Sequence, residues 1–200
     1  MRAYERELNQ DLDWALREGS MHFDEKSAVH DAVREIVRRL RQSEIQFAIV
    51  GGMALFYHGL RRFTEDVDVL VTPEGLQRVH RELDGLGYVP PFKGIRDLQN
   101  GVRIEFLVSG QYPGDGKPKP VAFPDPSGKV VEVGGVPILE LPALIELKLA
   151  SGMTNPGRLK DLADVQELIR VRRLPAEYGE QLHPYVRQKY AELWAGVQTP

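Results

Sequence analysis

The pattern of apolar and polar residues divides the chain into a first part that mixes helices with strands and a second part that is helical. Apolar residues recur at helical spacing from Ser27 onward, and short apolar runs over 47–50, 66–71 and 102–108 are typical of strands. From Leu141 the spacing is helical again. The pattern predicts an α+β fold, with a small mixed β-sheet flanked by helices and a helical C-terminal part.

Glycine and proline mark the ends of further predicted elements. Pro73 is expected to begin a helix that ends at Gly87, because proline is tolerated in the first helical turn and glycine often follows the last. A hairpin is predicted around the glycine pair at 134–135. Residues 110–128, rich in Gly, Pro, Lys and Asp, are interpreted as a long loop.

The helical part is predicted to contain three helices. The sequence SGMTNPG at 151–157 is expected to end the first, the second starts near Lys160, and the third spans 176–197. We expect two units, namely an α/β core with N-terminal helices over 1–140 and a helical subdomain over 141–200 that completes the functional site.

The composition is that of an ordinary globular protein, and it excludes several kinds of site. Of the 200 residues, 42% are hydrophobic and 28% are charged, and the lack of cysteine excludes disulfide scaffolds, thiolate metal sites and cysteine nucleophiles. The net charge of -3 argues against a surface coated with positive potential, although it allows local basic patches. The N-terminal sequence has no apolar core of signal-peptide length and no run approaches a membrane span, so the prediction is a cytoplasmic protein without a membrane partner.

Two aspartates interrupt the apolar strand over 66–71. Asp66 and Asp68 point to the same face of a strand because successive side chains alternate. Carboxylates at this spacing can converge on one divalent cation or bridge two, and oxygen ligands of this kind suit Mg²⁺ or Mn²⁺. The alternative is a strand end whose acids face water. Leaving both carboxylates ionised near a core without a cation would be costly.

A glycine pair follows the strand over 47–50. Gly51 and Gly52 precede a short helix predicted over 53–60. Small residues at such a turn let backbone N–H groups approach a phosphate, although strand-to-helix turns often need glycine for chain geometry alone. Together, the turn would hold a triphosphate and the aspartates would hold its metal.

Glu105 and Lys148 extend this candidate site. Glu105 shares a face with Arg103 and Leu107, so it joins the aspartates if its strand lies beside theirs, as a metal ligand or as a base for an incoming hydroxyl. Otherwise it is a solvent-facing glutamate. Lys148 lies on the apolar stripe of the helix that follows Leu141, where its ammonium must either reach solvent or meet an anion.

These motifs resemble the DNA polymerase β-like nucleotidyltransferase superfamily. A strand, Gly-Gly, a short helix, arginine and threonine, then two aspartates one residue apart occur in the family's order. The sequence LIELKLASGMTNPGRLKDLADVQELI is similar to the end of the AbiEii-like nucleotidyltransferase toxins, which carry a lysine on one helix and a basic-Asp pair opening the next. The resemblance covers roughly residues 45–172, and its motif residues are Gly51, Gly52, Arg61 or Arg62, Thr64, Asp66, Asp68, Lys148, Lys160 and Asp161.

The resemblance implies a nucleotidyltransferase fold and a role for each matching residue. In the family the two strand aspartates bind the catalytic metal, the lysine contacts nucleotide phosphate and the later aspartate orders the site. By resemblance these roles pass to Asp66, Asp68, Lys148 and Asp161 only. We further expect the glycine pair, Arg62 and Thr64 to bind the nucleotide together with Lys148. Two departures stand out: Gly52 replaces a phosphate-binding serine of many members, and Glu105 replaces the commoner aspartate.

The expected activity is metal-dependent transfer of an NMP from an NTP to an acceptor hydroxyl. Some relatives modify the 3′ end of tRNA, so the resemblance implies an RNA acceptor in a toxin–antitoxin or abortive-infection setting, with an antitoxin encoded nearby. Two alternatives stay open. One is an adenylyltransferase that modifies a small molecule such as an antibiotic, and the other is an inactive nucleotide-binding or interaction module.

Overall fold

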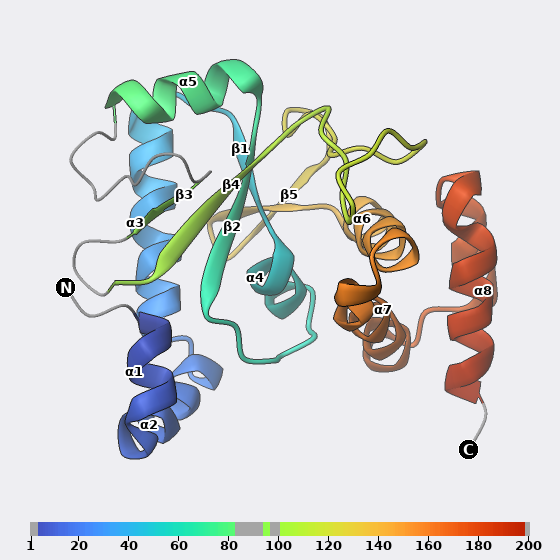
Figure 1. Cartoon of the computed structure of the whole chain (residues 1–200), viewed down its shortest axis with the longest axis horizontal. Coiled ribbons are helices and arrows are strands. Elements are labelled where there is room, and N and C mark those ends of the chain that lie inside the picture. Colours follow the sequence, from blue (N-terminus) through green and yellow to red (C-terminus); the bar gives the residue numbers. More distant parts are fainter. Residues whose placement is uncertain (1–3, 83–93, 97–100, 199–200) are drawn as a thin grey trace.

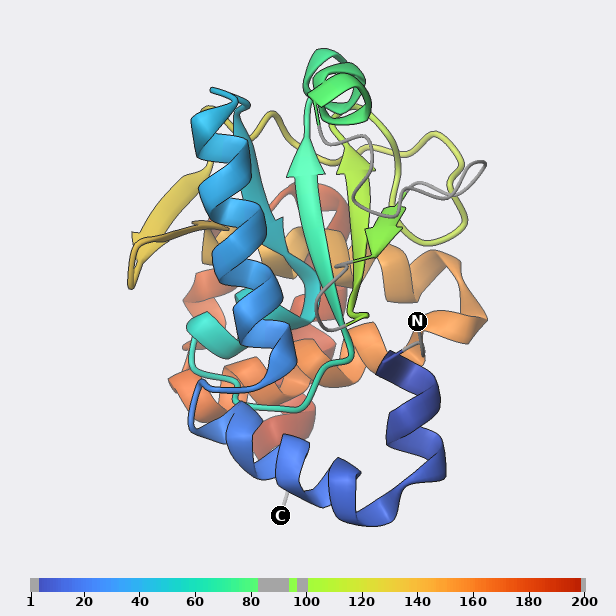
Figure 2. The same cartoon turned by 90° about the vertical axis from the view of Figure 1, so that its left-hand side faces the viewer.

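The computed structural model describes residues 4–82, 94–96 and 101–198, which form a six-stranded mixed sheet with helices on both faces (Figures 1 and 2). The strand order is β3-β4-β2-β1-β6-β5. Neighbouring strands pair antiparallel except β1 with β6 and β2 with β4, which are parallel. The strands are β1 (Phe47–Val50), β2 (Asp66–Val71), β3 (Gly94–Arg96), β4 (Arg103–Val108), β5 (Val130–Val133) and β6 (Val136–Leu139).

The helices divide between the two faces of the sheet. Figures 1 and 2 show α3 along one face and the group α6, α7 and α8 on the other. The α-helices are α1 (Tyr4–Gln10), α2 (Leu12–Phe23), α3 (Ala28–Gln42), α4 (Gly51–Tyr57), α5 (Pro73–Glu82), α6 (Leu141–Thr154), α7 (Leu159–Arg172) and α8 (Pro184–Gln198), and short 3₁₀ helices span Pro156–Arg158 and Ala176–Gln181. No helix in these ranges has both the length and the apolar run needed to cross a bilayer.

The apolar stripe of α3 packs on the sheet as its spacing predicts. Val29, Val33, Ile36 and Leu40 are at most 1% exposed. The side chain of Ser27 caps the helix by accepting a hydrogen bond from a backbone N–H in its first turn. Burial of this stripe against the sheet is therefore the main contribution of α3 to stability.

Strand β2 separates an apolar face from a carboxylate face. Val67 and Val69 are fully buried, whereas Asp66 and Asp68 are half-buried on the opposite face. The predicted hairpin is confirmed, because β5 and β6 are joined by Gly134 and Gly135, both with positive φ as a tight hairpin turn requires.

The helical part differs from the prediction at two places. The helix expected over 176–197 is two elements, because the proline that begins α8 lacks an N–H and disfavours a helical conformation at His183. Helix α6 continues through Ser151–Gly152 and ends at Thr154, because Asn155 precedes a proline and is extended.

Three smaller expectations also need adjustment. The short helix after β1 begins at the glycine pair itself and ends at Tyr57. Strand β3 was not predicted. The expected end of α5 near Gly87 lies outside the described residues.

Candidate functional site

The condition on which Glu105 can join the two aspartates is met, because the strands that carry these acids are neighbours. Strands β2 and β4 are parallel neighbours, with Asp66 opposite Arg103 and Asp68 opposite Glu105. Because side chains alternate along both strands, all four project from the same face of the sheet. A hydrophobic strand pair therefore carries three carboxylates and one guanidinium at a single place.

The Asp66 carboxylate has a protein partner on each oxygen. Thr64 Oγ1 donates to Oδ1 at 3.2 Å, and Arg103 Nη2 donates to Oδ2 at 2.8 Å. The guanidinium also lies 3.1 Å from Glu105 Oε1 through Nη1. Arg103 therefore bridges the first and third acids of the site.

Asp68 lies directly against the glycine turn. Val50 pairs with Asp68 across β1 and β2, which brings Gly51 beside the carboxylate. A Cβ at Gly51 would lie 1.8 Å from Asp68 Oδ2, and the φ of +60° at this glycine disfavours any other residue. A Cβ at Gly52 would lie 2.4 Å from the Thr64 hydroxyl. The glycine pair thus makes room for the site's own side chains.

Burial and neighbouring charge raise the pKa of Asp68 to about 7. Desolvation is the largest cause, and repulsion from Asp66 and Glu105 adds to it. Attraction from Lys148 opposes the rise. The negative charge of Asp66, Asp68 and Glu105 is therefore not fully neutralised by neighbouring cations. Such an excess of negative charge favours the binding of a cation.

We expect Gly51→Ala to destabilise the protein by roughly 2 kcal/mol or more beyond the cost of its positive φ. The left-handed conformation alone costs about 1–2 kcal/mol for a non-glycine residue, and the added Cβ must also push Asp68 aside. Gly134→Ala is the matched control, since Gly134 has φ +57° and nothing within 4 Å of the added atom. Urea unfolding of both variants measures the difference. Equal losses would show that the contact with Asp68 has no energetic role.

Lys148 meets two carboxylates from α7. Its side chain lies on α6, and the residue is 7% exposed. Lys148 Nζ donates to Asp161 Oδ1 at 2.9 Å and to Asp164 Oδ2 at 2.8 Å. Ser151 Oγ donates to Asp161 Oδ2 at 2.7 Å. The lysine therefore meets anions, as one of the two predicted outcomes has it, and does not extend into solvent.

Two arginines complete this polar network between α6 and α7. Arg62 approaches Asp164 at 2.8 Å and 3.1 Å, and Arg158 Nε donates to Asp161 Oδ2 at 2.9 Å. Burial opposes the ionisation of Asp161, but the attraction and hydrogen bonds of its cationic and hydroxyl partners outweigh it, and the pKa of Asp161 lies below its ordinary value. Asp161 is therefore an ionised partner of the buried Lys148 ammonium, and Asp164 pairs with both Lys148 and Arg62.

Asp164 belongs to this polar network and was not predicted from the sequence. It follows Asp161 by three residues, so both carboxylates lie on one face of α7. A sequence signal for Asp164 existed. Two aspartates three residues apart on one helix can both pair with a lysine that lies on the apolar stripe of the preceding helix.

The acids of β2 and β4 and the polar network between α6 and α7 line one cleft. Its volume is about 620 Å³, which is in the range of small-molecule sites. Every residue predicted for the site contributes to its wall: Gly51, Gly52, Arg62, Thr64, Asp66, Asp68, Glu105, Lys148 and Asp161. The wall also includes residues that no sequence pattern singled out, among them Gln111, Tyr112, Phe123, Ser151 and Asn155.

The two carboxylates of β2 form a donor set that fits a divalent cation. Within the described ranges, no three His, Asp or Glu side chains are arranged to hold a metal ion. The role of Glu105 as a third ligand stays a prediction, and Arg103 contacts both Glu105 and Asp66. Mg²⁺ is commonly bound by one or two carboxylates together with substrate phosphates and water. Asp66 and Asp68 are therefore the residues that fit the ion.

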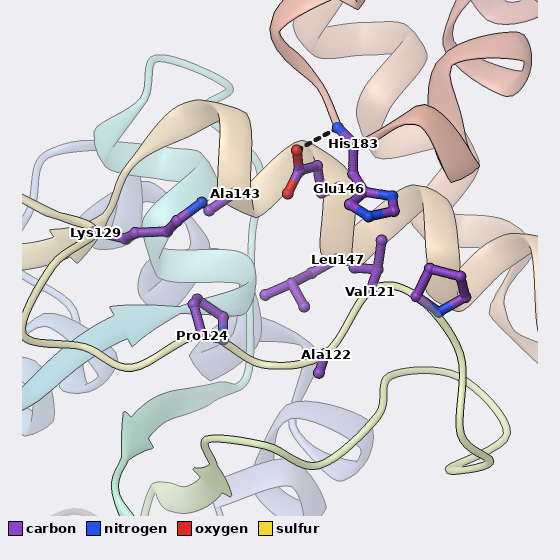
Figure 3. Close-up of a pocket in the computed structure, with 9 residues that line it drawn as sticks. Val121, Ala122, Pro124, Lys129, Ala143, Glu146, Leu147 and His183 are labelled. Atoms are coloured by element: carbon purple, nitrogen blue, oxygen red, sulfur yellow. Dashed lines mark hydrogen bonds between the residues drawn. The ribbon is translucent and has the colours of Figure 1, made fainter.

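A second pocket, shown in Figure 3, is too small for a nucleotide. Its volume is about 90 Å³, and Leu147 lines both it and the larger cleft. The backbone N–H of His183 donates to Glu146 Oε1 at 2.6 Å across its wall. This contact joins α6 to the segment before α8 and has no connection with the strand acids.

Solved structures share this fold, although no protein-family model and no curated protein matches the chain. A crystal structure of ANT(2″)-Ia in complex with adenylyl-2″-tobramycin has a TM-score of 0.51 at 14% identity and covers 83% of this chain and 97% of that one. A solution structure of the antibiotic-resistance factor ANT(2″)-Ia has a TM-score of 0.51 at 17% identity and covers 82% and 94%. A candidate nucleotidyltransferase from Thermotoga maritima covers 72% and 89% at 18% identity, and its TM-score of 0.40 is too low to indicate a shared fold.

The chain therefore has the predicted nucleotidyltransferase fold. At these identities the likeness is one of fold alone. The resemblance to the AbiEii-like branch stays a prediction, as do the residue roles it implies.

Proposed function

We propose that the cleft binds a nucleoside triphosphate with Mg²⁺ or Mn²⁺ and transfers its nucleotidyl group to an acceptor hydroxyl. The observation that carries this proposal is the placement of the two β2 aspartates in the same cleft as the cationic network of α6 and α7. A triphosphate needs both a metal site and positive charge, and this cleft combines them. Its cationic lining side chains are Arg62, Arg103, Lys148, Arg158 and Lys160.

The proposed reaction is a displacement at the α-phosphorus. The acceptor oxygen forms a bond to phosphorus, the bond to the β-phosphate oxygen breaks and pyrophosphate leaves. The metal, when bound by Asp66 and Asp68, neutralises charge that develops on the phosphate. Glu105 accepts the hydroxyl proton, a role supported by its place in the cleft beside the two aspartates.

Lys148 is proposed to act on the phosphates mainly by organising other groups. Its ammonium already has two carboxylate partners, so it holds α7 in place and fixes Asp161 and Asp164. Arg158 is better placed to move toward a phosphate, since its side chain is 59% exposed. Arg62 and Thr64 belong to the proposed nucleotide-binding set, because both line the cleft and Thr64 also orients Asp66.

The finer proposal is an RNA acceptor, such as a tRNA 3′ end, in a toxin–antitoxin setting. Its support is the motif resemblance together with the basic pair Arg158 and Lys160 on the cleft wall. A small-molecule acceptor would instead have to fit inside the cleft together with the triphosphate.

Transfer from labelled NTPs tests the proposal. The protein is incubated with each α-labelled NTP, Mg²⁺ and total RNA, and in parallel with aminoglycoside and lincosamide antibiotics. Label in RNA that requires Asp68 supports the RNA acceptor, and label in an antibiotic supports the small-molecule alternative. Nucleotide binding without transfer to any acceptor would favour a binding module and contradict the proposal.

A further inference from the structure

Arg103 occupies the side of Asp66 that a metal ion would need. The arginine lies on β4, and its side chain is 44% exposed. Its guanidinium contacts Asp66 Oδ2 at 2.8 Å, Glu105 Oε1 at 3.1 Å and, from α1, Glu5 Oε1 at 3.8 Å. Three carboxylates from three elements therefore surround one cation.

The two aspartates of β2 differ in how their charge is balanced. Both oxygens of Asp66 are engaged, one by the Thr64 hydroxyl and the other by Arg103. Asp68 has repulsive carboxylate neighbours and, in the part of the chain that the structure describes, no side-chain hydrogen bond or ion pair. A divalent cation can therefore approach Asp68 directly but must compete with a guanidinium for Asp66.

We propose that Arg103 is an exchangeable counterion of Asp66, which positions this carboxylate before metal binding and is displaced by the ion. The inference rests on the proposed function, because it presumes that Asp66 is a metal ligand. Displacing Arg103 from Asp66 adds a free-energy cost to metal binding that Asp68 alone would not impose. After displacement, the guanidinium can remain paired with Glu105 and Glu5.

The energetic scale of this competition is modest. Losing one ion pair between partly exposed side chains shifts an equilibrium by only about 1.4- to fivefold, and the contact with Asp66 is shorter than that with Glu105. Removing Arg103 as the competitor should therefore tighten metal binding by about 1.4- to fivefold. The guanidinium restrains Asp66, so it acts as a positioning group as well as a competitor.

Binding of Mn²⁺ alone tests the inference without any transfer reaction. Free Mn²⁺ is measured by electron paramagnetic resonance in titrations of the full chain, its Arg103→Gln variant and its Arg103→Lys variant. We expect the Kd of Arg103→Gln to fall about 1.4- to fivefold, with Arg103→Lys closer to the original protein because it keeps the charge. Circular dichroism checks that each variant is folded.

Arg158→Gln is the control that separates direct exchange from a general change of field. Arg158 lines the same cleft but pairs with Asp161 instead of Asp66. An equal gain in Mn²⁺ affinity for Arg158→Gln and Arg103→Gln would overturn the exchange, as would unchanged or weaker binding for Arg103→Gln. Failure of the proposed metal site itself would look different, because Mn²⁺ binding would then be insensitive to Asp68→Asn.

Discussion

Asp68→Asn should abolish nucleotidyl transfer and, at the same time, stabilise the metal-free protein at pH 8. The ionised carboxylate is costly in the folded state, because burial and the neighbouring acids raise its pKa to about 7. Asparagine keeps the shape and removes the charge. The loss of transfer should be at least the roughly 10²–10³-fold typical of removing one electrostatic stabiliser.

The sign of the pH dependence follows from the raised pKa. The unfolded carboxyl titrates near 3.9, so the folded state binds the proton more tightly, and the stability from this group is present below about pH 4 and lost as pH rises through about 7. The asparagine variant lacks this loss. Its advantage over the original chain should therefore grow by up to about 2 kcal/mol between pH 5.5 and pH 8.

Urea unfolding in the presence of a chelator measures this difference. Asp125→Asn is the control, because Asp125 lies in an exposed loop and the Ser127 side chain and backbone hold its pKa below the ordinary value. That variant should gain no stability at pH 8. An advantage of Asp68→Asn that is the same at both pH values would contradict the charge argument.

Lys148→Met should destabilise the protein by about 3 kcal/mol or more and remove activity with it. Methionine preserves the apolar stem, so the loss reports the ammonium alone. Without that ammonium, Asp161 and Asp164 are left buried and facing each other, and breaking a buried pair typically costs about 3–5 kcal/mol. Arg62 and Arg158 still neutralise part of the charge, which favours the lower end of the range.

A double variant identifies the cause of this loss. Lys148→Met combined with Asp161→Asn should recover part of the stability, because one unpaired carboxylate is removed with the lysine. Lys129→Met is the control, since Lys129 is 46% exposed and lies 3.7 Å from Glu140, and it should change stability by less than about 0.5 kcal/mol. A Lys148→Met variant as stable as this control would mean that the buried network contributes nothing.

The sequence predicted the parts of the site that follow from local periodicity. The alternation along β2 and β4 placed Asp66, Asp68 and Glu105 on one face, and the structure confirms that the two strands are neighbours. The stripe on α6 indicated that Lys148 must either reach solvent or meet an anion, and the structure supplies the anion from α7. The sequence thus placed each side chain on a face of its own element, and the packing of the elements decided what it meets.

The sequence did not show which long side chains meet across elements. The bridge from Arg103 to Asp66 depends on the pairing register of β2 and β4, and the contact of Arg62 with Asp164 joins residues about a hundred positions apart. The sequence also did not show which side chains lie against the glycine pair. Glycine at 51 indicated backbone access, whereas the structure shows that the Asp68 carboxylate fills the space of its missing side chain.

The most direct test of the central claim is equilibrium binding of a non-hydrolysable NTP to the full chain, measured by calorimetry with Mg²⁺ and again with chelator. The account predicts binding that requires Mg²⁺ and that Asp68→Asn weakens severely, because the metal held by the β2 aspartates links the triphosphate to the cleft. Binding of equal strength with Mg²⁺ and with chelator, or binding untouched by Asp68→Asn, would contradict the assignment of this cleft as a metal-dependent nucleotide site.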